Sequence, residues 1–130
     1  MSKEAYSKVA KIAVTIFMKI KPNENVTVVT DSGRTKLGEA LEKAARELGN
    51  ETVTVVMQPR KMHGNEPPEA VAAIMKVSDV VLTATTYALT HTVARLAATR
   101  AGARVLIMRG VTEDVLDREL LLQIWARSSI

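Results

Sequence analysis

Few residues in this sequence have side chains that could perform chemistry, and the two histidines are the first to weigh. His63 lies in the stretch "PRKMHGNEPP" (59–68), with Glu66 three positions later and Glu69 beyond it. This could be half of a metal site, or a polar connection on the rim of a sheet. Neither His63 nor His91 belongs to an HExxH pair, and a divalent metal site normally needs three or more protein ligands. We therefore favour a polar loop residue for His63 and a helix-start residue for His91, and we assign no metal ligand.

A second candidate is the glycine-containing stretch "TDSGRTKLG" (30–38). It has neither the GxGxxG fingerprint of dinucleotide sites nor the GxxxxGK[ST] phosphate loop. We favour a structural role over phosphate binding, in which Ser32 and Gly33 turn the chain and Asp31 or Ser32 caps the following helix. Asp31, Ser32 and His63 could form a Ser-His-Asp arrangement on paper, but the GxSxG spacing of a nucleophile elbow is missing. We therefore assign no catalytic residue.

The elements that must position these residues alternate between two kinds of pattern. Apolar residues at steps of three and four predict a helix over 3–20, stopped by Lys21-Pro22. Four short apolar runs predict strands, and the segments after them have helical periodicity. The expected strands are 25–31, 51–58, 78–86 and 103–110, and the expected helices that follow them are 35–50, 67–77, 89–102 and 112–130.

This alternation predicts a single α/β domain over residues 1–130. It would be a three-layer Rossmann-like or flavodoxin-like sandwich, with about four parallel strands and helices on both faces. The second, third and fourth strands are nearly unbroken apolar runs, so we expect them to be covered on both faces. Ligands of such sheets bind outside the carboxyl ends of the strands, where the strand order reverses.

The polar residues that follow the strands would therefore meet at one edge. We expect this edge to be the functional surface and to bind a small anion or nucleotide if the chain is a stand-alone binding module. Its candidate residues are Asp31, Ser32, Arg34, Gln58, Arg60, His63, Thr85, Thr86, Tyr87, His91 and Arg109.

The composition excludes several classes of protein. The 130 residues, 47% of them apolar, are enough for a proper core, and the absence of cysteine excludes disulfides, thiolate zinc sites and a cysteine nucleophile. No apolar segment is long enough to cross a bilayer, so we expect a cytoplasmic protein without a membrane partner. The net charge is +4, but the basic residues are scattered and aromatic residues make up only 3%, which disfavours nucleic-acid binding.

The last expected helix is apolar on more than one face. A helix that covers one side of the sheet would leave some of these residues exposed, which indicates a partner surface and a homo-oligomer. A simply well-buried helix is the alternative. The interface candidates are Leu116, Leu120, Leu121, Ile124 and Trp125.

Three stretches carry a resemblance to a known family: "HGNEPP" (63–68), "SDVVLTATTYALTHT" (78–92) and "AGARVLIMRGVTED" (101–114). With them, nearly the whole chain resembles the N-terminal domain of metallo-aminopeptidases of the aminopeptidase T type, often labelled leucyl aminopeptidase in thermophilic bacteria and archaea. The resemblance implies an enzyme that removes N-terminal residues from peptides with a pair of zinc, cobalt or manganese ions. A metal-dependent relative cleaves a hydroxylated pyridine ring, so the fold does not determine the chemistry.

In this family the metal ligands lie in a separate C-terminal domain, which this sequence does not contain. The resemblance therefore implies a scaffold domain that helps to shape the substrate chamber and the assembly, without cofactor of its own and inactive alone. The chain would be a fragment, a stand-alone domain, or a subunit that acts with a separate catalytic chain.

Overall fold

Helices and strands alternate along the chain in the order that the periodicity predicts. The computed structural model describes residues 3–62 and 64–109. The elements are α1 (Lys3–Ile12), the π-helical turn η1 (Ala13–Phe17), β1 (Val26–Asp31), α2 (Thr35–Glu47), β2 (Thr52–Met57), α3 (Glu69–Val77), β3 (Val80–Thr85), α4 (Val93–Arg100) and β4 (Arg104–Arg109).

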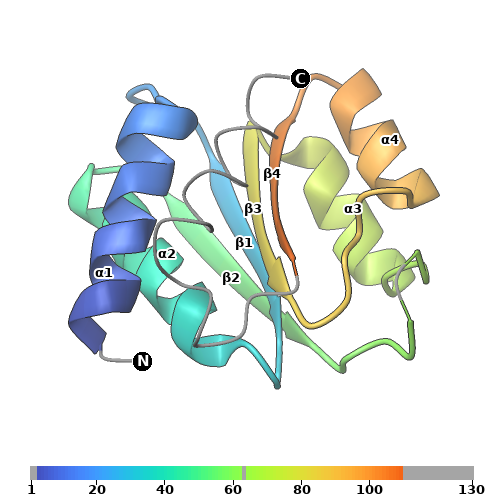
Figure 1. Ribbon diagram of the computed structural model, residues 1–130. Helices are drawn as coiled ribbons and strands as arrows, with labels where there is room; N and C mark the ends of the chain where they lie inside the picture. The colour runs from blue at the N-terminus through green and yellow to red at the C-terminus, as the bar shows by residue number, and fades with distance from the viewer. Residues whose placement is uncertain (1–2, 63, 110–130) are drawn as a thin grey trace.

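The four strands form one parallel sheet in the order β2-β1-β3-β4. Figure 1 shows α1 and α2 over one face of this sheet and α3 and α4 over the other. The predicted three-layer α/β sandwich with four parallel strands is therefore confirmed. The chain runs from β1 outward to β2 and then crosses back to β3, so the switch point lies between β1 and β3.

The two central strands supply the middle of both cores. All residues of β1 and β3 are buried, and successive side chains point to opposite faces of the sheet. Val28 and Leu82 belong to the core under α1 and α2, whereas Val29 and Val81 belong to the core under α3 and α4. Burial on both faces explains why the third strand reads as a nearly unbroken apolar run.

The expectation that the second strand is covered on both faces is wrong. β2 lies at the end of the sheet, and its Val53 and Val56 are 54% and 57% exposed. An apolar run does not reveal strand order, and β2 has a neighbouring strand on one side only in the described part of the chain. Its exposed valines therefore mark an open edge.

Helix boundaries differ from the expected ones by two to four residues, and two of them have an identifiable cause. The first helix ends in the π-helical turn at Phe17 instead of reaching residue 20, and the carbonyl of Met18 accepts a hydrogen bond from Arg104. The fourth described helix begins at Val93 instead of residue 89, because Thr92 takes the N-cap position and accepts the backbone N–H of Arg95. The cap hydrogen bond of Thr92 thus sets the start of α4, whereas the first helix cannot continue through Lys19, whose φ is 46°.

Several expectations lie outside the described residues. They are the helix over 112–130 with its interface candidates Leu116, Leu120, Leu121, Ile124 and Trp125, and the candidate ligand His63.

Candidate functional site

The carboxyl ends of the four strands lie at one edge of the sheet, as parallel pairing requires. Asp31 is in register with Met57, and Thr85 is in register with Arg109. The segments that follow these residues carry the candidate side chains predicted from the sequence. The switch point between β1 and β3 brings Asp31 and Thr86 together at the centre of this edge.

Asp31 links the two strands across the switch point. Its Oδ2 accepts the backbone N–H of Thr86 at 2.7 Å, and its Oδ1 accepts the Thr86 hydroxyl and the backbone N–H of Gly33, both at 2.9 Å. Asp31 is completely buried. Both carboxylate oxygens therefore accept hydrogen bonds that join the end of β1 to the residue after β3 and to the turn at Gly33.

This arrangement corrects the expected helix cap. The N-cap position of α2 is Arg34, which makes no side-chain cap hydrogen bond, so neither Asp31 nor Ser32 caps this helix. Asp31 instead accepts hydrogen bonds from the backbone N–H and the hydroxyl of Thr86. Sequence spacing could not reveal this partner because it lies on another strand, 55 residues away.

Threonines join the same region to its neighbours. Thr30 donates its hydroxyl to the carbonyl of Ala84 at 2.8 Å and to that of Arg34 at 3.0 Å, and Thr85 donates to the carbonyl of Tyr87 at 2.7 Å. Thr85 is buried, as is Thr30. The threonine hydroxyls at the switch point therefore donate to backbone carbonyls of the strands and of the turns that follow them.

A pocket of about 280 Å³ opens at the start of α2. The backbone N–H groups at a helix N-terminus and the basic residues Arg34 and Lys36 make its lining favourable to negative charge. The Nε atom of Arg34 is buried and has no hydrogen-bond partner among the described residues. The lining residues are Tyr6, Ser32, Gly33, Arg34, Thr35, Lys36 and Leu37.

The loop after β2 is organised by its own side chains and by α4. Asn65 Oδ1 accepts the backbone N–H groups of Lys61 and Met62, and the N–H of Gly64 donates to the carbonyl of Ala88 at 3.2 Å. Gly64 has a φ of 85°, in the left-handed region that glycine adopts readily. The loop is thus held against the segment between β3 and α4.

Glu66 completes this attachment. Its carboxylate accepts the backbone N–H groups of Val93 at 2.8 Å and Ala94 at 3.1 Å, at the N-terminus of α4. A negative charge there is favoured by the helix dipole, and α4 has no acidic residue in its own first turn. The glutamate that followed His63 in a possible metal motif is therefore engaged as a cap on another helix.

Two further candidates lie in the segments that follow β2 and β3. Arg60 is half-buried in the loop after β2, and His91 is exposed in the turn before α4. Within residues 3–62 and 64–109, no group of three His, Cys, Asp or Glu side chains could hold a metal ion. No helix in the same ranges is long and apolar enough to cross a membrane.

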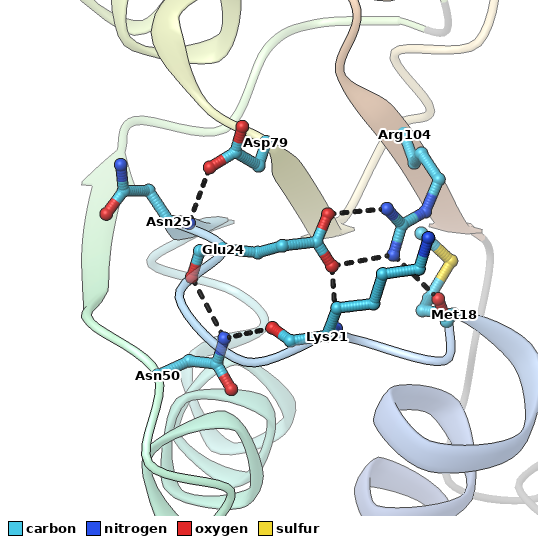
Figure 2. A network of polar contacts seen from close by, with 7 residues as sticks. All are labelled: Met18, Lys21, Glu24, Asn25, Asn50, Asp79 and Arg104. Atoms are coloured by element: carbon cyan, nitrogen blue, oxygen red, sulfur yellow. Dashed lines mark hydrogen bonds and ion pairs between the residues drawn. The ribbon is translucent and has the colours of Figure 1, made fainter.

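The amino ends of the strands carry a polar network that no local sequence pattern predicts. Figure 2 shows Arg104, at the start of β4, reaching the loop before β1. Its Nη1 lies 2.6 Å from Glu24 Oε2, and its Nη2 donates to Glu24 Oε1 and to the carbonyl of Met18. Asn50 Nδ2 donates to the carbonyls of Lys21 and Glu24, both at 2.9 Å.

The electrostatics of this network favour the charged form of Glu24. The hydrogen bond from Arg104 lowers the pKa of Glu24, and the backbone N–H of Lys21 acts in the same direction, while burial opposes both. Asp79 adds a further link by accepting the backbone N–H of Asn25 at 2.7 Å. These contacts fasten the amino ends of the strands, away from the candidate site.

Comparisons with known proteins identify the fold alone. No protein-family model and no curated protein matches the sequence. Among solved structures, the chain is similar to 2,5-dihydroxypyridine dioxygenase from Pseudomonas putida KT2440, with a TM-score of 0.69 and 13% sequence identity. The match covers 85% of this chain but 35% of the dioxygenase chain, so this chain spans about a third of that enzyme.

Proposed function

We propose that this chain is the N-terminal α/β layer of a larger metal-dependent enzyme of the aminopeptidase T type, and that it does not hydrolyse peptides alone. The observation that carries this proposal is the engagement of Asp31. In open α/β sheets the switch point is where ligands bind, and here it holds a buried carboxylate that accepts three hydrogen bonds from Thr86 and Gly33.

The chemistry of amide hydrolysis explains why this engagement matters. A general base must be able to reach the proton that it abstracts, and a metal ligand must direct a lone pair at the ion. Asp31 directs its oxygens at protein donors instead, and Glu66 directs its oxygens at the N-terminus of α4. Both carboxylates thus have structural partners, which favours a supporting role for this layer.

The structural comparison is consistent with a layer of a longer enzyme. The dioxygenase contains this α/β unit in about a third of its length. Its chemistry differs from peptide hydrolysis, as expected when a shared layer supports different catalytic parts. In our proposal zinc, cobalt or manganese and the peptide substrate bind to a catalytic part outside residues 1–130. We further propose a cytoplasmic enzyme, because the chain uses no cysteine.

The coding sequence downstream of Ile130 tests this proposal. We expect it to encode, in the same frame or as an adjacent subunit, a domain whose His, Asp and Glu residues can ligate two metal ions. Co-purification of that domain with this chain and metal-dependent release of N-terminal residues from peptides by the complex would support the proposal. A downstream region without such a domain would contradict it.

The pocket at the start of α2 favours a second candidate, a stand-alone module that binds a small anion or nucleotide. Arg34 and Lys36 line the pocket beside the first N–H groups of α2. Thermal unfolding with phosphate, nucleotides and carboxylates tests it, because a ligand that binds the folded state raises the unfolding temperature. Stabilisation that Arg34→Gln removes and Arg100→Gln leaves would favour this candidate. No stabilisation by any of these ligands would exclude it.

A further inference from the structure

The outer edge of β2 offers unpaired backbone groups. The N–H of Val26 donates to the carbonyl of Glu51, and alternate residues of a parallel strand bond to the same neighbour. The backbone groups of Thr52, Thr54 and Val56 therefore face away from β1. No strand pairs with this side of β2 within the described ranges.

This edge lacks the features that usually prevent edge pairing. The six residues of β2 include no charge, proline or glycine. Val53 and Val56, which project to opposite faces of the sheet, are both more than half exposed. An extended strand laid along this edge would pair the outward N–H and C=O groups and cover a valine on each face.

One outward group already has a partner. Arg46 Nη2 donates to the carbonyl of Thr52 at 3.0 Å, so the end of the edge nearest to Thr52 is occupied. The outward groups of Thr54 and Val56 remain for pairing. This limits the registers that a second strand can adopt without displacing Arg46.

We propose that β2 pairs with β2 of a second copy of this chain, antiparallel and around a two-fold axis at Val55. In this register Thr54 lies opposite the partner's Val56, and Arg46 keeps its bond to Thr52. A two-fold axis perpendicular to the sheet pairs residues that point to the same face, which the opposition of Thr54 and Val56 satisfies. The two sheets then form one continuous sheet.

The charges at the two ends of β2 favour a copy in this orientation. Glu51 precedes the strand, and Arg60 and Lys61 follow it. Antiparallel pairing brings Glu51 of one copy beside the basic end of the other, whereas parallel pairing would place like charges together. Because β2 itself is uncharged, no like charges meet within the paired strands.

Cysteine cross-linking tests the register directly, since the natural chain has no cysteine. In this register Val55 lies directly opposite its copy, in a pair whose Cα atoms are about 4.5 Å apart, within the reach of a disulfide. Val53 is more exposed than Val55, yet the same register separates it from its copy by roughly 13 Å along the strand. We expect Val55→Cys to form a disulfide-linked dimer at least about fivefold faster than the matched control Val53→Cys.

Sedimentation velocity of the full chain provides the second readout. We expect reversible, concentration-dependent dimerisation that Val56→Lys weakens at least about tenfold, because a lysine on an edge strand opposes pairing. Val77→Lys makes the same change at an 80% exposed position of α3 and should leave the dimer unchanged. Three results would each overturn the proposal. They are a monomer at every concentration, equal cross-linking of the two cysteine variants, and loss of association with Val77→Lys but not with Val56→Lys.

Discussion

The carboxylate of Asp31 lies 2.7 Å from the backbone nitrogen of Thr86, and this contact joins the ends of β1 and β3. The two residues are 55 positions apart in the sequence and meet only because β1 and β3 are neighbours in the sheet. In open α/β sheets ligands bind at the switch point, and here the Asp31–Thr86 hydrogen bonds occupy that position. The energetic importance of this link can be measured.

Removing the Asp31 carboxylate should destabilise the fold. Asp31→Ala removes a buried carboxylate and leaves the donors of Thr86 and Gly33 without their acceptor, and we expect a loss of about 2–4 kcal/mol in the free energy of unfolding. Thr86→Val removes one hydrogen bond but keeps the backbone N–H, so its cost should be about 1 kcal/mol. Urea unfolding measures both, with the exposed neighbour Ser32→Ala as control. A stability of Asp31→Ala equal to that of Ser32→Ala would show that the link is dispensable.

Glu24 should make stability depend on pH. Arg104 lowers the pKa of Glu24 in the folded state, so the folded protein holds this proton less tightly than the unfolded chain. The stabilisation is fully present above the unfolded-state pKa and is lost as the pH falls through the folded-state pKa. We expect Glu24→Gln to cost about 1 kcal/mol at neutral pH, since Arg104 is partly exposed to solvent.

Urea unfolding of both proteins from pH 7 to pH 3 measures this effect. The stability difference between the natural chain and Glu24→Gln should shrink toward the acid end of this range. Glu51→Gln, at an exposed position outside the network, provides the control. A difference that stays constant with pH would mean that Arg104 does not favour the ionised form of Glu24.

Glu66 should stabilise α4 from outside that helix. Glu66→Ala removes the acceptor of the Val93 and Ala94 N–H groups, and we expect a cost of about 0.5–2 kcal/mol, as for other N-terminal caps. Amide hydrogen exchange should quicken at Val93 and Ala94. Glu39→Ala, at an exposed position of α2, should leave both amides unchanged. Unchanged exchange in Glu66→Ala would refute the capping role.

The sequence predicts the layers of this fold well because they depend on local periodicity. The apolar runs around Val28 and Leu82 are strands, and the order of elements requires a parallel sheet whose carboxyl ends share an edge. Strand order is a tertiary property, so the exposed position of β2 was not predictable from its apolar residues. The open edge at Val53 and Val56 appears only in the structure.

The spacing of residues in the sequence does not predict the contacts of the candidate site either. Asp31 preceded a helix and fitted a cap, but a partner with two donors lay on the neighbouring strand. The role of Glu66 did have a sequence signal. The first turn of α4 contains no acidic residue, so its N-terminus could bind a carboxylate from another segment. The link between Glu24 and Arg104 spans 80 positions and left no local pattern.

The most direct test of the supporting role proposed for this layer is a hydrolysis assay of the purified full chain. An aminoacyl p-nitroanilide is incubated with the chain and with zinc, cobalt or manganese, and the release of p-nitroaniline is followed. We expect the rate to equal that of metal and buffer alone at every protein concentration. A rate that rises in proportion to the chain and disappears with a chelator would contradict the account, because catalytic groups would then lie within residues 1–130.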